Sequence, residues 1–240
     1  MAAFFLSPEK IFHAIRDSSL YNDTVSDFKP QLVSAGAVAD SKLRKSDRTR
    51  AAILDGALEF LWTRPFREMT VAELMSITGI GRSAFYQYFK DLHELMETLL
   101  LGVAEAVFEA ADPWFNGAGD PSELLQHSLA GMVKVCYERG PILRAVAEAS
   151  TTDERLESMW ADFLAEFDDA VSGRIEQHQA AGVISKFEAR PVAVALNRLD
   201  TSLVIHAFGR HPRSNPEPVR EAITRIWMST LYQSNYKPDS

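Results

Sequence analysis

Residues 70–89 are TVAELMSITGIGRSAFYQYF and predict two short helices joined by a tight turn. Thr70 and Glu73 have the spacing of a capping box, in which a hydroxyl and a carboxylate satisfy free amides at a helix start. The helix that they begin should end near Thr78, because Gly79 readily adopts the left-handed backbone conformation that stops a helix. Two short helices linked by such a turn are typical of a helix-turn-helix.

The second short helix should begin at Gly81 or Arg82 and end near Tyr88. A helix about 10 Å wide fits the major groove of B-DNA, where arginine and glutamine hydrogen-bond base edges. We expect its outer face to contact bases and neighbouring side chains to contact phosphates. The predicted DNA-binding residues are Arg48, Thr70, Arg82, Ser83, Ala84, Tyr86, Gln87, Tyr88 and Lys90. The predicted small core beneath them is Leu74, Ile77, Ile80, Phe85 and Phe89.

The charge of the chain is unevenly distributed. The whole chain has a net charge of -8, yet residues 42–90 contain nine basic and five acidic side chains and so carry +4. The remaining residues therefore sum to -12. A basic module on an acidic body can hold phosphates locally while the body repels them, which favours a nucleic-acid partner for residues 42–90 alone.

The rest of the chain predicts only helices, because apolar residues recur at three and four positions and no alternating strand pattern occurs. We expect an all-α fold with a partly flexible arm at 1–45, a helix-turn-helix domain at 46–90 and a larger effector-binding and dimerisation domain at 91–240. Within the arm, Ser7-Pro8-Glu9 predicts the start of a short helix to about Arg16. The predicted long helices are 47–62, 91–111, one from Asp120 that breaks at Gly140-Pro141, 153–180, 190–208 and 217–234.

Composition argues for a soluble cytoplasmic protein with no membrane partner. The chain has one cysteine, Cys136, in an apolar stretch, so we expect a buried thiol and no internal disulfide. No run of 18 apolar residues occurs, and the opening residues lack the basic segment of a signal peptide.

Two matches to enzyme motifs are incomplete. Gly79-x-Gly81-x-x-Ala84 follows a helix, whereas a dinucleotide-binding fingerprint follows a strand. The stretch from His93 to Glu97 lacks the second histidine of a zinc-protease helix, and capping explains Glu94. The sequence therefore predicts no enzyme, no catalytic residue, no metal and no cofactor.

Three segments together resemble the DNA-binding domain of TetR-family regulators. They are residues 51–57 (AAILDGA), 69–74 (MTVAEL) and 78–89 (TGIGRSAFYQYF). The family's Tyr-x-x-Phe ending falls at Tyr86 and Phe89. The family usually has a phosphate-binding lysine three residues later, where this chain has Leu92, so Lys90 is predicted to replace it.

The C-terminal half is similar, more weakly, to the EthR-like branch of that family, on residues 159–163 (MWADF), 195–200 (ALNRLD) and 226–232 (IWMSTLY). The resemblance implies a homodimer built by the last two helices and an apolar cavity for a small lipophilic effector. The implied ligand-binding residues are Trp160, Leu164, Phe167, Asn197, Asp200 and Trp227. Asp200 departs from the branch, which has a neutral amide there, so the polarity of the effector is expected to differ.

Two questions stay open from the residues alone. The aromatic stripe Trp160, Phe163 and Phe167 fits plain core as well as a ligand cavity, and Asn197 and Asp200 need partners that are either neighbouring helices or a ligand. The predicted function is a transcriptional repressor released from a palindromic double-stranded DNA operator by its effector. The alternative is a helical DNA-binding regulator without a small-molecule effector.

Overall fold

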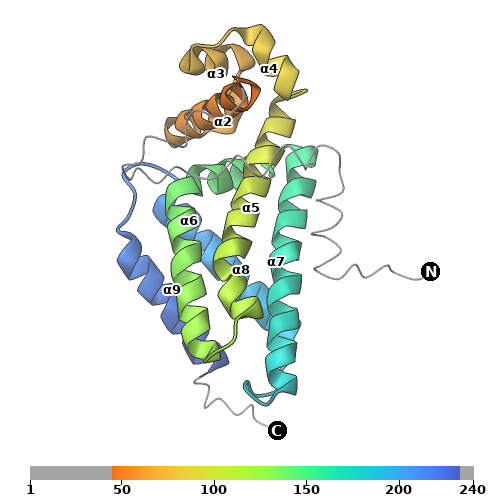
Figure 1. Cartoon of the computed structure of the whole chain (residues 1–240), viewed down its shortest axis with the longest axis vertical. Helices are drawn as coiled ribbons and strands as arrows, with labels where there is room; N and C mark the ends of the chain where they lie inside the picture. The colour runs from red at the N-terminus through yellow and green to blue at the C-terminus, as the bar shows by residue number, and fades with distance from the viewer. Residues whose placement is uncertain (1–44, 233–240) are drawn as a thin grey trace, which may run out of the picture. The chain divides into compact units, whose positions relative to one another are not determined.

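The computed structural model describes residues 45–232, and their regular secondary structure is entirely helical (Figure 1). The predicted arm, including the short helix at 7–16 and the basic residues Lys42 to Arg44, lies outside this range, as does the side chain of Lys45. The elements are α2 (Lys45–Thr63), η1 (Phe66–Glu68), α3 (Val71–Thr78), α4 (Arg82–Tyr88), α5 (Leu92–Asn116), α6 (Pro121–Ala149), α7 (Glu154–Ala180), α8 (Ala189–Phe208) and α9 (Pro216–Leu231). The all-α prediction is confirmed for the described residues.

The chain divides into two compact units, and the division falls inside α5, after Gly102. The proposed boundary between residues 90 and 91 remains a prediction. In the first unit α3 packs against both α2 and α4. Its core contains fully buried side chains from α2, α3, α4 and the start of α5, among them Ile53, Leu61, Leu74, Phe85 and Leu95.

One predicted core residue of the first unit is on the surface. Ile77 is 41% exposed, and Ile80 is half-buried, whereas Leu74, Phe85 and Phe89 are buried as predicted. The buried residues of α3 are Leu74 and Met75.

The second unit is a bundle in which α8 packs against α6, α7 and α9, and α6 packs against α7 and α9. Figure 1 shows α8 passing obliquely to the directions of α6 and α7. Both helix ends predicted for α7 are confirmed, because Asp153 caps the amides of Arg155 and Leu156, and Gly182 has a positive φ of 73°. Within the described residues, no helix is both long and apolar enough to cross a membrane.

The predicted break at Gly140-Pro141 is wrong, because α6 continues through both residues. Pro141 cannot donate the backbone hydrogen bond that Tyr137 would accept in an unbroken helix. The guanidinium of Arg213 replaces it, donating to the Tyr137 carbonyl at 2.8 Å while lying 3.9 Å from the centre of the Tyr137 ring. Gly140 is needed for packing, since a Cβ there would lie 2.6 Å from the Phe208 carbonyl oxygen.

Helix α5 also runs further than predicted, passing through Pro113 to Asn116. The buried hydroxyl of Ser128 on α6 supports this last turn. It accepts a hydrogen bond from the Trp114 amide at 3.1 Å and donates to the Ala111 carbonyl at 3.3 Å. A side chain from the neighbouring helix therefore bonds the backbone where proline disturbs the regular pattern.

The large apolar residues of α9 lie on the face that packs into the bundle. Ile223, Trp227 and Leu231 are at most 3% exposed and belong to the core of the bundle. They recur every four residues, so one helix face accounts for all of them. On α8, Val194 and Leu203 are half-buried.

Candidate DNA-binding surface and effector-binding region

The turn between α3 and α4 has the geometry that a helix-turn-helix requires. Thr70 accepts a hydrogen bond from the Glu73 amide at 3.2 Å and so caps α3. Gly79 ends α3 in the left-handed conformation, with φ 68° and ψ 12°. Residues 70 to 89 therefore form two short helices at the positions that the sequence predicted.

The predicted capping box at Thr70 has additional partners. The Glu73 carboxylate accepts from the Thr70 hydroxyl at 2.9 Å and from Arg64 at 2.9 Å, and it also interacts with the Thr70 backbone amide. Hydrogen bonds from Arg64, and then from Thr70, hold the pKa of Glu73 below its usual value. Arg64 also bonds Glu68 and lies 4.6 Å from the Phe60 ring centre, so it fastens the end of α2 to the start of α3. Sequence reasoning missed this role, although the four-residue spacing of Arg64 and Glu68 is a visible signal.

Helix α4 presents polar side chains outward and aromatic ones inward. Arg82, Ser83 and Gln87 are exposed and Tyr86 is 55% exposed. Phe85 is fully buried beneath them. Of the other predicted DNA-binding residues, Arg48, Thr70 and Lys90 are exposed, while Ala84 and Tyr88 are half-buried. The outer face of α4 is thus exposed within its own unit, and an α-helix has a width that fits a major groove.

The start of α5 is fixed next to Lys90. Asp91 accepts from the Glu94 amide at 2.9 Å, and the Glu94 carboxylate accepts from the Lys90 amide at 2.6 Å. The backbone of Lys90 is held while its side chain stays exposed, which suits a phosphate contact.

In the second unit, aromatic rings form a continuous row along α7 and α5. Trp160 stacks on Phe163 at 5.2 Å between ring centres, Phe163 meets Phe167 at 5.1 Å, and Phe167 stacks on Phe108 at 4.4 Å. All four rings are only half-buried, as is Leu164. Leu156 and Val171 of the same helix are buried, so the half-buried rings leave both the plain-core and the ligand-cavity interpretations open.

Asn197 is bonded to a neighbouring helix. It donates to Asp168 of α7 at 2.9 Å, and Arg198 donates to the same carboxylate through two nitrogens at 3.2 and 2.8 Å. Asp168 is 2% exposed, so this cluster ties α8 to α7 through a buried charge that is fully paired. For Asn197 the structure supplies the helix partner, and a ligand contact remains a prediction.

Asp200 is only partly satisfied. Its Oδ2 accepts from the Trp227 indole at 2.9 Å, whereas its Oδ1 is buried and has no hydrogen-bond partner among the described residues. Burial raises the pKa of Asp200 to about 8, against a small opposite effect of the Trp227 hydrogen bond. A free buried oxygen of this kind is uncommon in folded proteins.

A buried network that sequence reasoning missed lies beside Trp227. The Trp114 indole, 2% exposed, donates to the Tyr232 hydroxyl at 2.8 Å, and that hydroxyl lies 3.1 Å from Nδ1 of His178. Trp114 also meets Trp227 edge to face at 5.8 Å. No local spacing could have revealed these pairings, since Trp114 and Tyr232 are 118 residues apart.

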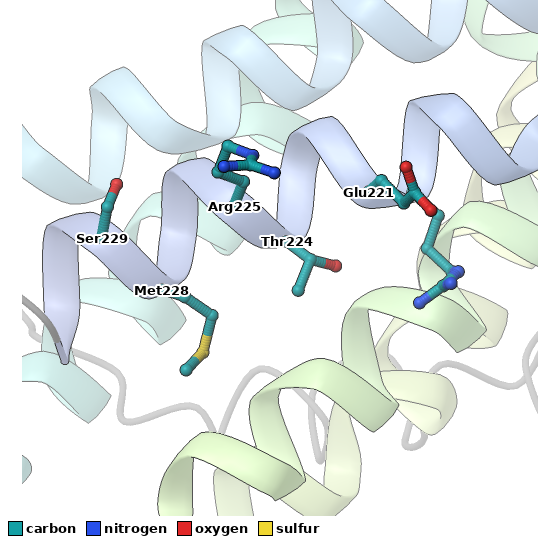
Figure 2. Close-up of a pocket in the computed structure, with 6 residues that line it drawn as sticks. Glu221, Thr224, Arg225, Met228 and Ser229 are labelled. Carbon is teal, nitrogen blue, oxygen red and sulfur yellow. The ribbon is translucent and has the colours of Figure 1, made fainter.

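The outer side of α9 carries an open surface pocket (Figure 2). Its lining residues come from α9 alone and include none of the predicted ligand-binding residues: Arg220, Glu221, Thr224, Arg225, Met228 and Ser229. These residues lie on a different face of α9 from the buried side chain of Trp227.

Comparison with known families accounts for both units. Residues 53–99 match the family of bacterial regulatory proteins of the tetR type, and residues 125–233 match the C-terminal domain of the transcriptional regulator EthR. The chain belongs to the TetR family of transcriptional regulators. Its second unit is of the EthR type.

Relatives and solved structures agree with this assignment. The EthR regulator of Mycolicibacterium smegmatis is 25% identical over 193 residues, covering 78% of this chain and 87% of the relative. EthR of Mycobacterium tuberculosis is 24% identical over 195 residues, covering 79% and 89%. A solved TetR-family regulator from Rhodococcus sp. has the same fold, with a TM-score of 0.65 and 21% identity over 76% of this chain and 98% of that one. This TetR-family protein is a DNA-binding regulator of transcription and not an enzyme.

Proposed function

We propose that this regulator is a homodimeric repressor that a small apolar effector releases from a palindromic operator. The observation that carries the DNA-binding part is the outer face of α4, where Arg82, Ser83, Tyr86 and Gln87 are exposed above the buried Phe85. Two copies of α4 would enter successive major grooves about 34 Å apart on one face of the DNA. The proposed DNA-binding domain is 46–90, and the effector and dimerisation domain is 91–240.

Base contacts and phosphate contacts are assigned to different residues. Arg82 and Gln87 have side chains that hydrogen-bond base edges, while Arg48, Thr70, Tyr86, Tyr88 and Lys90 are proposed to hold phosphates. The excess of positive charge in residues 42–90 supports DNA contact by this part of the chain.

The effector site is proposed at the aromatic row, with Trp160, Leu164 and Phe167 as contacts and with Asp200, Asn197 and Trp227 at its polar side. Support comes from the half-buried state of the rings on α7 and from their stacking on Phe108 of α5. A ligand that separates Phe108 from Phe167 would move α5, the helix that continues into the DNA-binding unit. Release requires only that the ligand favours the non-binding state, and a coupling of about 1 to 3 kcal/mol gives a 5- to 150-fold change.

The dimer is proposed to form through α8 and α9 as a four-helix bundle with the partner subunit. The outward face of α9 around Arg220, Thr224 and Met228 would then be covered.

Selection of bound DNA from a random pool, followed by competition with candidate ligands at fixed salt, tests the proposal. We expect a palindromic site, and we expect Arg82→Ala to weaken binding about 5- to 150-fold and to relax sequence preference at one position of each half-site. Lys186→Ala is the matched control, because it removes one exposed positive charge from the second unit. An Arg82→Ala protein with unchanged affinity and site preference would refute the role of α4. A palindromic site that no ligand weakens would favour a regulator without an effector.

A further inference from the structure

The buried carboxyl group of Asp200 stands at one end of a row of seven aromatic rings. Trp227 bonds its Oδ2 and meets Trp114, and ring contacts of 4.4 to 6.2 Å between centres continue the row. The rings that follow Trp114 are, in order, Phe115, Phe108, Phe167, Phe163 and Trp160. Trp227 and Trp114 are buried, whereas the five outer rings are half-buried. The row therefore leads from partly exposed side chains to a buried acid.

The free oxygen of that acid points to a missing partner. Asp200 is 8% exposed, and its Oδ1 receives no hydrogen bond from any residue between 45 and 232. Buried polar atoms are almost always paired, because leaving one unpaired costs its lost hydration. Of the groups that interact with Asp200, Trp227 on α9 is neutral, and burial raises the pKa of Cys136 on α6 to about 12, so its thiol stays uncharged.

The surroundings of the row favour a positive charge. Aromatic faces attract cations through their quadrupole, and a desolvated carboxylate pairs with a cation far better than with a neutral group. Acidic side chains also lie on α7, the helix that carries Phe163 and Phe167: the pKa of Glu166 is raised first by burial and then by its like-charged neighbours Asp162 and Asp169.

We propose that the effector is a lipophilic amine in its cationic form, whose ammonium group pairs with Asp200 and whose apolar body lies along the aromatic row. This inference rests on the effector-binding part of the proposed function and specifies its ligand class. Below pH 8 the Asp200 carboxylic acid loses its proton to solvent when the ammonium binds, so that the bound pair is ammonium and carboxylate.

Three probes of equal chain length separate this class from others: decylammonium, decanol and decanoate, each kept below micelle formation. Tryptophan fluorescence and calorimetry give their dissociation constants for the full chain, and release of the selected operator gives the functional readout. We expect decylammonium to bind at least tenfold more tightly than decanol, and decanoate to bind most weakly. The affinity of decylammonium should rise about tenfold for each pH unit from 6 to 8 and then level off, because Asp200 must ionise. The affinity of decanol should not change with pH.

Asp200→Asn keeps the shape of the side chain and removes the charge. It should abolish the preference for decylammonium and leave decanol within about twofold of its original affinity. Glu176→Gln is the control, since it removes one exposed carboxylate of the same unit. If the variant is poorly folded, the pH dependence of the unaltered protein decides the question by itself.

The outcomes distinguish this inference from the proposed function. If decanol binds as tightly as decylammonium and releases the operator equally well, the effector function stands and the cationic class is wrong. If Asp200→Asn keeps the preference for the amine, Asp200 is not its partner. If no probe binds or releases the operator at any pH, both the cationic class and the lipophilic effector fail.

Discussion

The helix-turn-helix unit and the helical bundle of the second unit differ in how far apart along the chain some of their bonded side chains lie. At the start of α3 the side-chain hydrogen bonds join residues three to nine positions apart, as between Thr70 and Glu73 or Arg64 and Glu73. The bundle has local caps, but it also has side-chain hydrogen bonds between residues much further apart: 29 positions for Asn197 and Asp168, and 118 for Trp114 and Tyr232. The geometry of the turn therefore depends on residues within a short window of sequence, whereas part of the hydrogen bonding in the bundle does not.

The largest effect that tests this comparison is expected at Gly140. Gly140→Ala would place a methyl group 2.6 Å from the carbonyl oxygen and 2.7 Å from the carbonyl carbon of Phe208, and this backbone cannot move cheaply. We expect a loss of about 1 to 3 kcal/mol in the free energy of unfolding by urea. Gly173→Ala is the control, because no heavy atom lies within 4 Å of a Cβ there, and it should stabilise α7 by about 0.5 to 1 kcal/mol. Equal changes in the free energy of unfolding at the two glycines would show that the close approach of Phe208 to α6 does not contribute to stability.

A smaller effect is expected at Arg213, whose partner in α6 is 76 residues away. Arg213→Ala would leave the Tyr137 carbonyl without its donor and remove the cation above the Tyr137 ring, costing about 1 to 2 kcal/mol. Urea unfolding followed by circular dichroism measures it. Arg210→Ala, which breaks an exposed pair with Glu148, should stay within about 0.5 kcal/mol. If Arg213→Ala leaves the free energy of unfolding unchanged, α6 continues through Pro141 without the hydrogen bond from Arg213.

The smallest effect is expected for the local contact that caps α3. Thr70→Ala removes the acceptor of the Glu73 amide and should cost about 1 kcal/mol of local stability. Amide hydrogen exchange within residues 71–78 reports on that helix alone. The control is Ser76→Ala on an exposed position of the same helix. Comparable exchange rates in the two variants would contradict the importance of the cap.

The extent to which the sequence predicted this structure follows the same division. Thr70, Gly79 and the buried Phe85 and Phe89 were predicted where the structure has them, because caps, left-handed glycines and apolar spacing act within a few residues. The continuity of α6 was not predictable, since Pro141 alone indicates a break and the compensating Arg213 lies in a distant loop. The tendency of proline to break a helix is a local rule. Here the guanidinium of Arg213, from a distant loop, supplies the hydrogen bond that Pro141 cannot donate.

The candidate sites show the same limit. The exposed face of α4 was predicted correctly because amphipathic spacing decides which side chains point outward. For Asn197 and Asp200 the sequence showed only that buried polar groups need partners. Which groups they meet, Asp168 for one and Trp227 for the other, depends on how α7, α8 and α9 pack.

The buried thiol of Cys136 makes the protein convenient for site-specific labelling. Because burial raises the pKa of Cys136 to about 12, little of its thiol is ionised at pH 7, and the thiolate is the form that attacks maleimides. A cysteine introduced at an exposed position such as Gln87 or Val183 would ionise near pH 8.5 and react first. Spin labels or fluorophores can therefore be attached to the native background, and the separation of the two copies of α4 in the proposed dimer can be measured with and without a candidate ligand.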